Sequence, residues 1–241
     1  MNLAEKIIAF NQALSFEESL PEGIRIMNPY RENLEAFRVS SLFYRKYYSN
    51  THPRRLIMGI NPGRFGAGVT GIPFTDTYRL KEFCGLDIPG LTSRETSSAF
   101  VYEMIGAYGG PEYFYNDFFI TATCPLGFVK VNSGGREVNF NYYDDPLLLE
   151  IMEPFMIRSL ETQLGFGFLC DTCFCLGNNK NFHYLNALNK QKGYFGEIIP
   201  LEHPRFIMQY RMKQKEHFIM RYLEVLQSRP FPRSPGEPTM I

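Results

Sequence analysis

The sequence predicts an α/β fold in three layers, α/β/α, around a central, mostly parallel four-stranded sheet. Short apolar runs bounded by Gly, Pro or Asn alternate along the chain with longer segments of helical periodicity. This alternation implies right-handed βαβ crossovers, which place helices on both faces of a parallel sheet. With 44% hydrophobic and 15% aromatic residues, the chain can bury a sizeable core. We therefore expect one domain over residues 1–228.

The expected elements follow one another in a regular order. Apolar side chains at helical spacing indicate helices at residues 3–13 and 34–48, before the first strand. The apolar runs that indicate strands are residues 56–60, 118–123, 172–176 and 197–201. The helices between and after these strands are expected at residues 97–107, 146–163, 180–191 and 211–226. Four prolines between residues 229 and 238 exclude a continuing helix, so residues 229–241 are expected to form a loose, Pro-rich tail.

The charge and cysteine content narrow the class of protein. The formal net charge is zero and the pI is about 6.9, so any nucleic-acid contact must come from a local patch. Five cysteines, an odd number, and the lack of a secretory signal favour a reducing cytoplasm. No apolar run approaches the ~20 residues that span a bilayer, so no membrane partner is expected.

A Gly-rich segment follows the first expected strand. Ligands of parallel α/β sheets bind outside the carboxyl ends of the strands, which makes residues 59–68 the first place to look for a site. Glycines let backbone N–H groups converge on an anion. This segment, however, lacks both the Gly-Lys-Ser/Thr end of a P-loop and the helix-opening glycines of a dinucleotide site. Taken alone, it fits a tight turn equally well.

The longer string around this segment resembles a known family. The first motif of the single-strand-selective monofunctional uracil-DNA glycosylases is similar to Gly59-Ile60-Asn61-Pro62-Gly63-Arg64-Phe65-Gly66 followed by Thr70-Gly71-Ile72-Pro73-Phe74. Further elements resemble that family in the same order, between about residues 56 and 211. They are Cys124-Pro125-Leu126, Ser133-Gly134-Gly135, Cys175-Leu176-Gly177 and Leu201-Glu202-His203-Pro204-Arg205.

The resemblance implies a DNA glycosylase of the uracil-DNA glycosylase superfamily, which flips uracil out of DNA and hydrolyses its N-glycosidic bond. It implies DNA as the partner and no metal or organic cofactor, and we expect a monomer. Cleavage develops positive charge on the sugar and negative charge on the base. By this resemblance Asn61 orients the attacking water, His203 donates to the departing base and Phe74 stacks on it. The other base-binding positions are expected at Gly59, Ile60, Gly63, Phe65, Ala122 and Cys124.

Two departures separate this chain from the family pattern. Ala122 stands where the family has an asparagine that reads the base edge, so reading must pass to the backbone, to pocket shape, or to Asn132, Asn139 or Asn141. A wider base range, with another deaminated base such as xanthine, is the expected consequence. The family's Ser-Pro after His203-Pro204 is also missing. A wedge at Phe206-Ile207-Met208 is expected there, with burial against the last helix as the alternative. Further DNA contacts are expected at Arg205, Gln209, Arg211 and Lys213.

Other interpretations of the sequence stay open. The spacing of Cys170, Cys173 and Cys175 could chelate a soft metal, but their place on an apolar run without a second Cys/His pair favours buried thiols. The basic stretch at residues 205–221 fits a solvated helix face or a grip on phosphate. The chain could also be a nucleotide- or nucleoside-processing enzyme that uses the Gly-rich loop, or a damaged-DNA-binding module without activity.

Overall fold

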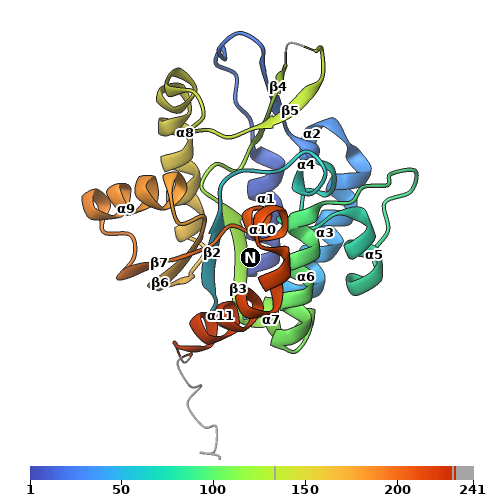
Figure 1. The fold of residues 1–241 in the computed structure, drawn as a ribbon, viewed down its shortest axis with the longest axis vertical. Helices are drawn as coiled ribbons and strands as arrows, with labels where there is room; N and C mark the ends of the chain where they lie inside the picture. Colours follow the sequence, from blue (N-terminus) through green and yellow to red (C-terminus); the bar gives the residue numbers. More distant parts are fainter. Residues whose placement is uncertain (133, 230, 232–241) are drawn as a thin grey trace, which may run out of the picture.

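The central sheet contains the four predicted strands, all parallel, in the order β3-β2-β6-β7 (Figure 1). The structure is a computed structural model, which describes residues 1–132, 134–229 and 231. The strands are β2 (Arg55–Gly59), β3 (Phe118–Ala122), β6 (Leu169–Leu176) and β7 (Glu197–Leu201). The predicted fold class is therefore confirmed.

The chain's path between the strands puts helices on both faces of the sheet. The step from β2 to β3 runs one way across the sheet, and the steps from β3 to β6 and from β6 to β7 run the other way. Right-handed crossovers then place α6 on one face and both α8 and α9 on the opposite face, as Figure 1 shows. The long helices are α1 (Leu3–Ala13), α3 (Leu34–Tyr48), α6 (Thr96–Tyr108), α8 (Pro146–Leu164), α9 (Lys180–Lys192) and α11 (Lys215–Gln227).

Several shorter helices lie outside the predicted pattern. They are α2 (Pro29–Glu32), α4 (Ala67–Thr70), α5 (Thr77–Cys84), α7 (Pro111–Asp117) and α10 (Pro204–Tyr210), with the 3₁₀ turn η1 (Met212–Gln214). These elements are too short to show a clear apolar period. In α2, α5, α7 and α10 the sequence signal is a capping side chain or a proline in the first turn. The helix expected to begin at residue 211 begins at Lys215, because α10 and η1 occupy the preceding residues.

A second, antiparallel sheet was not predicted. It has the order β1-β4-β5, with β1 (Ile24–Met27), β4 (Gly127–Val131) and β5 (Glu137–Phe140) among the described residues. The strands are four or five residues long and partly exposed, so they lack the uniformly apolar composition of the central strands. In Figure 1 the β4-β5 hairpin projects beyond the central sheet, on the side where α8 begins.

The described part of the chain ends shortly after α11. Of the predicted tail, only Arg229 and Phe231 are described, so the expectation of a loose tail lies outside the described residues. Among the described residues, no helix is long and apolar enough to cross a membrane.

Candidate active site

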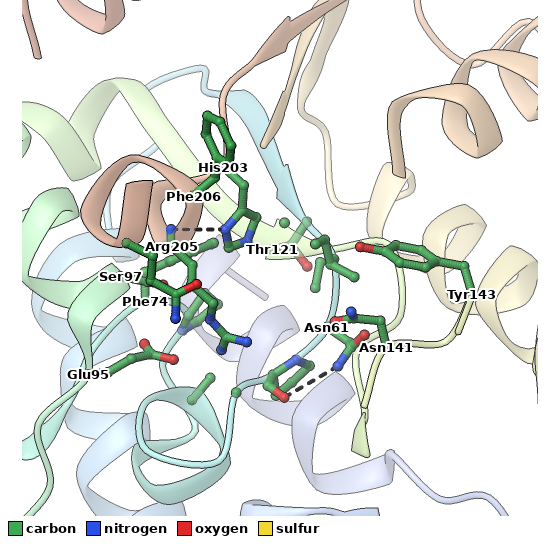
Figure 2. A pocket seen from close by; sticks show the side chains of 18 of the residues that line it. Asn61, Phe74, Glu95, Ser97, Thr121, Asn141, Tyr143, His203, Arg205 and Phe206 are labelled. Carbon is green, nitrogen blue, oxygen red and sulfur yellow. Dashed lines mark hydrogen bonds between the residues drawn. The ribbon is translucent and has the colours of Figure 1, made fainter. Parts of the chain in front are cut away.

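A cavity of about 270 Å³ lies at the carboxyl ends of β2, β3 and β7, and we call it the strand-end cavity (Figure 2). Parallel register aligns Gly59 with Ala122, so the ends of β2 and β3 reach the same edge of the sheet. The cavity is lined by Gly59, Ile60, Asn61, Pro62, Gly63, Ala67, Pro73, Phe74, Glu95, Ser97, Thr121, Ala122, Asn141, Tyr143, His203, Arg205, Phe206, Gln209 and Tyr210.

Asn61 is held in place by the unpredicted second sheet. Its Nδ2 donates to the carbonyl of Phe140 at 3.2 Å, and its Oδ1 accepts from the N–H of Tyr142 at 3.2 Å. The β4-β5 hairpin also holds the Gly-rich loop three residues after Asn61, since Asn139 Oδ1 accepts from the N–H of Arg64 at 2.8 Å. An amide oxygen carries two lone pairs, so Asn61 Oδ1 can accept one more hydrogen bond.

Phe74 reaches the strand-end cavity through an unusual backbone conformation. Its φ is +51°, the left-handed region that non-glycine residues rarely adopt and that costs about 1–2 kcal/mol. The buried hydroxyl of Thr70 fixes this turn by accepting from the N–H of Ile72 at 3.1 Å and donating to the carbonyl of Thr75 at 2.7 Å. A Cβ at Gly59 would lie 2.9 Å from the Phe74 ring, so glycine is needed there for the ring to lie against β2.

His203 is both the N-cap of α10 and part of the cavity wall. Its Nδ1 accepts from the N–H of Arg205 at 3.1 Å, which leaves the proton of a neutral imidazole on Nε2. Burial, with the Arg205 charge as the second cause, lowers the pKa of His203 to about 3. The ring lies 5.8 Å from that of Phe74, measured between centroids. His203 is therefore a neutral hydrogen-bond donor at ordinary pH.

Glu95 and Ser97, at the start of α6, are cavity residues that sequence reasoning missed. A Cβ at Gly63 or Gly66 would collide with the Glu95 carboxylate, which therefore fills the space that the glycines leave. Burial raises the pKa of Glu95, while a hydrogen bond from Ser98 lowers it. The Ser97 hydroxyl is buried and has no hydrogen-bond partner among the described residues. These two residues could not be assigned to the site from the sequence, because they are distant from the Gly-rich loop and no local motif connects the two segments.

Two residues expected in the base site lie elsewhere. Cys124 is completely buried in the small core beneath the second sheet, and its N–H donates to the carbonyl of Ile60. Phe65 is 47% exposed, lies under the Arg64 guanidinium and does not line the strand-end cavity. By contrast, Gly59, Ile60, Gly63, Phe74 and Ala122 do line it, as expected.

The expected wedge at Phe206-Ile207-Met208 is wrong for two of its three residues. The segment is helical, so its side chains point in different directions, and Ile207 and Met208 are buried in the main core. Phe206 and Tyr210, one helical turn apart, are 41% and 68% exposed and line the cavity together with Gln209. Pro204 directly after a capping residue is the sequence signal that marks this helix start. Arg211 and Lys213 are exposed beyond the end of α10.

The structure places the candidate base-reading asparagines and the cysteines in different surroundings. Of the three asparagines proposed to read the base, Asn141 lines the cavity, Asn139 holds Arg64, and Asn132 caps the exposed hairpin turn. Cys173 and Cys175 are fully buried on β6, and burial raises the pKa of both thiols. Within residues 1–132, 134–229 and 231, no group of three or more His, Cys, Asp or Glu residues could hold a metal ion.

Comparison with known proteins decides the family. The family model of the uracil DNA glycosylase superfamily matches residues 46–227, a range that includes every residue lining the strand-end cavity. The chain belongs to the uracil DNA glycosylase superfamily. The crystal structure of wild-type Pedobacter heparinus SMUG2 is similar to it, with a TM-score of 0.92 and 47% sequence identity over 95% of this chain and 98% of that chain. No curated protein matches.

This membership confirms the resemblance recognised in the sequence and argues against the nucleotide-processing alternative. The chain is a divergent member of the uracil DNA glycosylase superfamily, similar to SMUG2. Its Gly-rich loop begins at the end of β2, and its histidine follows β7. Both belong to the strand-end edge where ligands of parallel sheets bind.

Proposed function

We propose that the protein is a monofunctional DNA glycosylase that removes uracil, and a second deaminated base, from DNA. The observation that carries this proposal is the meeting of Asn61, Phe74 and a neutral His203 in one cavity. A flipped base can stack on the Phe74 ring, and His203 Nε2–H can donate to the base oxygen on which negative charge develops.

The chemistry needs positioned groups rather than a strong base. The oxygen of a water molecule forms a bond to C1′ of the sugar while the C1′–N bond breaks and its electron pair leaves with the base. Asn61 is a neutral amide, so it contributes by orienting that water, and His203 contributes by stabilising the departing anion. One such donor is typically worth about 3–4 kcal/mol. No lysine that could form a Schiff base is among the described residues that line the cavity.

The DNA strand is proposed to run along α10. Phe206 and Tyr210 are exposed aromatic side chains with ring centroids 5.5 Å apart, next to Arg205 and Gln209. Aromatic side chains of this kind can fill the gap that a flipped nucleotide leaves in a duplex. Arg205, Arg211 and Lys213 are proposed to contact phosphate groups around that gap.

Replacing Phe206 and Tyr210 with alanine is expected to lower excision from duplex DNA by about ten-fold and to affect single strands less, because single strands have no base stack to refill. Rates on matched single- and double-stranded uracil oligonucleotides check this. Ile207→Ala is the matched control. Removal of this buried side chain should lower the melting temperature and reduce excision from both substrates alike. Equal losses on both substrates for the aromatic pair would contradict the wedge.

Base selection is proposed to depend on Ala122 and the space that it leaves. A short apolar side chain at the end of β3 cannot read the imide edge of a base, so we propose that backbone groups and the shape of the strand-end cavity do so, with Asn141 as the alternative reader. Uracil and xanthine share an imide edge, whereas the amino group of cytosine reverses the donor pattern. We therefore expect activity on uracil and xanthine and refusal of cytosine.

A panel of oligonucleotides with uracil, xanthine, hypoxanthine, thymine or cytosine tests this function, beside the Ala122→Asn variant. The asparagine should narrow activity toward uracil, since it supplies an amide and takes up space. Uracil-only activity that the substitution leaves unchanged would show that another group reads the edge. Absence of excision with tight binding would instead favour an inactive damage-binding module, and turnover of free nucleosides a nucleoside-processing enzyme.

A further inference from the structure

Asn141 occupies a place in the strand-end cavity directly beside Asn61. The carbonyl before it and the N–H after it are the two groups that hold the Asn61 amide. Asn61 thus pairs with the chain on both sides of residue 141, as a residue of a neighbouring strand would. Both asparagine side chains line the cavity, and Figure 2 shows their amide groups next to each other.

The orientation of the Asn141 amide is set by Asp144. Asn141 Nδ2 and the Asn141 backbone N–H both donate to Asp144 Oδ2, each at 2.9 Å. This turns the amino group of Asn141 toward Asp144, so Oδ1 is the half of the amide that has no hydrogen-bond partner among the described residues. Asn61 Oδ1 also keeps one lone pair, since Tyr142 takes the other.

Both side chains line the strand-end cavity, and each amide oxygen keeps a lone pair for a further hydrogen bond. We infer that Asn61 and Asn141 together hold the attacking water, an inference that rests on the proposed glycosylase function. The water donates one hydrogen to each Oδ1, which directs an oxygen lone pair toward C1′ of the flipped nucleotide. A single acceptor would leave the water free to rotate about one hydrogen bond, whereas two acceptors fix its orientation.

The step is balanced without any further reagent. As the water oxygen bonds to C1′, the C1′–N bond breaks and its electron pair leaves with the base. The bound water then loses one proton to solvent and the base takes one up, so the products are a neutral base and an abasic sugar. Neither amide accepts the proton permanently, because neutral amides are poor bases. Asn141 is thus a catalytic residue that touches the nucleophile, and Asp144 is a positioning residue that acts through it.

A base-reading role for Asn141 makes a different prediction. A side chain that reads the base edge would change the relative rates on uracil and xanthine when it is removed. A side chain that holds the water would slow both bases by the same factor, because the water attacks the sugar and not the base. The two roles are therefore separable by substrate panel alone.

The test compares Asn141→Ala with the wild type in single-turnover excision of uracil and xanthine oligonucleotides. We expect a loss of about 10²-fold that is equal for both bases. Binding of an oligonucleotide with non-hydrolysable 2′-fluoroarabino-uridine should stay unchanged. Asn132→Ala, which removes an asparagine from the exposed hairpin turn, is the matched control and should keep the wild-type rate. A wild-type rate for Asn141→Ala, weaker analogue binding or a changed base ratio would each overturn the inference.

A double substitution gives the sharpest readout. If both asparagines hold one water, Asn61→Ala/Asn141→Ala should excise no more slowly than Asn61→Ala, because the water is already released. Multiplied losses would mean that the two residues act independently, against the inference. Asp144→Ala leaves both amides intact and should lower the excision rate less than Asn141→Ala does. It therefore tests the inference if Asn141→Ala folds poorly. A wild type that forms no abasic sites would refute the proposed function itself, a result distinct from all of these.

Discussion

Asn61→Ala is expected to lower the rate of uracil excision by about 10²–10⁴-fold while DNA binding stays nearly intact. The amide is proposed to orient the water and not to grip phosphate, and its hydrogen bonds among the described residues go to the backbone of residues 62, 140 and 142. Single-turnover rates and the affinity for a non-hydrolysable uracil analogue measure the two effects separately.

The control for this variant comes from the same hairpin. Asn139→Ala removes a hydrogen bond to Arg64 but leaves the Asn61 amide in the cavity, so its rate should fall much less. Excision by Asn61→Ala within a few-fold of the wild type would show that another residue orients the water.

His203→Asn is expected to lower excision by about 10²–10³-fold, the usual effect of removing one donor to a developing oxyanion. Asparagine is a good N-cap, so this variant can still accept from the N–H of Arg205 and keep the start of α10. It cannot place a donor where the imidazole Nε2–H lies. A rate near that of the wild type would make His203 a capping residue only.

The lowered pKa of His203 adds a dependence on pH. Because this pKa is about 3 in the folded protein, the ring stays neutral, and excision should show no inflection near pH 6.5 that depends on His203. The unfolded chain takes up a proton below about pH 6.5 that the folded chain refuses, so acid favours unfolding. The stabilising effect of the neutral ring is complete above pH 6.5 and is lost as the pH falls toward 3. Denaturant unfolding at pH 7 and at pH 5 checks this. Between these two pH values the free energy of unfolding should fall more for the wild type than for His203→Asn.

The central sheet and the long helices could be predicted because their signal is local and repeated. Apolar runs of five or more residues indicated the strands, and helices such as α3 and α8 showed a regular apolar face with clear starts. The antiparallel sheet could not be predicted in the same way. Its strands are short and partly exposed, and their pairing depends on contacts between segments as far apart as β1 and β4.

The residues of the candidate site could be predicted where each belongs to a local sequence motif. Asn61, Phe74 and His203 follow strand ends and belong to recognisable strings. Glu95 reaches the strand-end cavity from the N-cap of α6, which no sequence motif indicated. Asn141 was one of three asparagines considered from the sequence, and only the folded chain places it in the cavity. The wedge was misassigned because no helix was expected between the strand at residues 197–201 and the helix at residues 211–226. As a helix beginning at Pro204, it points Ile207 inward and Phe206 outward.

The proposed reaction is hydrolysis of the bond between uracil and deoxyribose in DNA. Incubation of the wild type with a labelled uracil-containing single strand, followed by quantification of free uracil and of alkali-sensitive sites, tests it most directly. We expect equal amounts of both products, with an intact strand before alkali and no products from Asn61→Ala at matched times. Absence of free uracil, or strand cleavage before alkali is added, would contradict a monofunctional glycosylase.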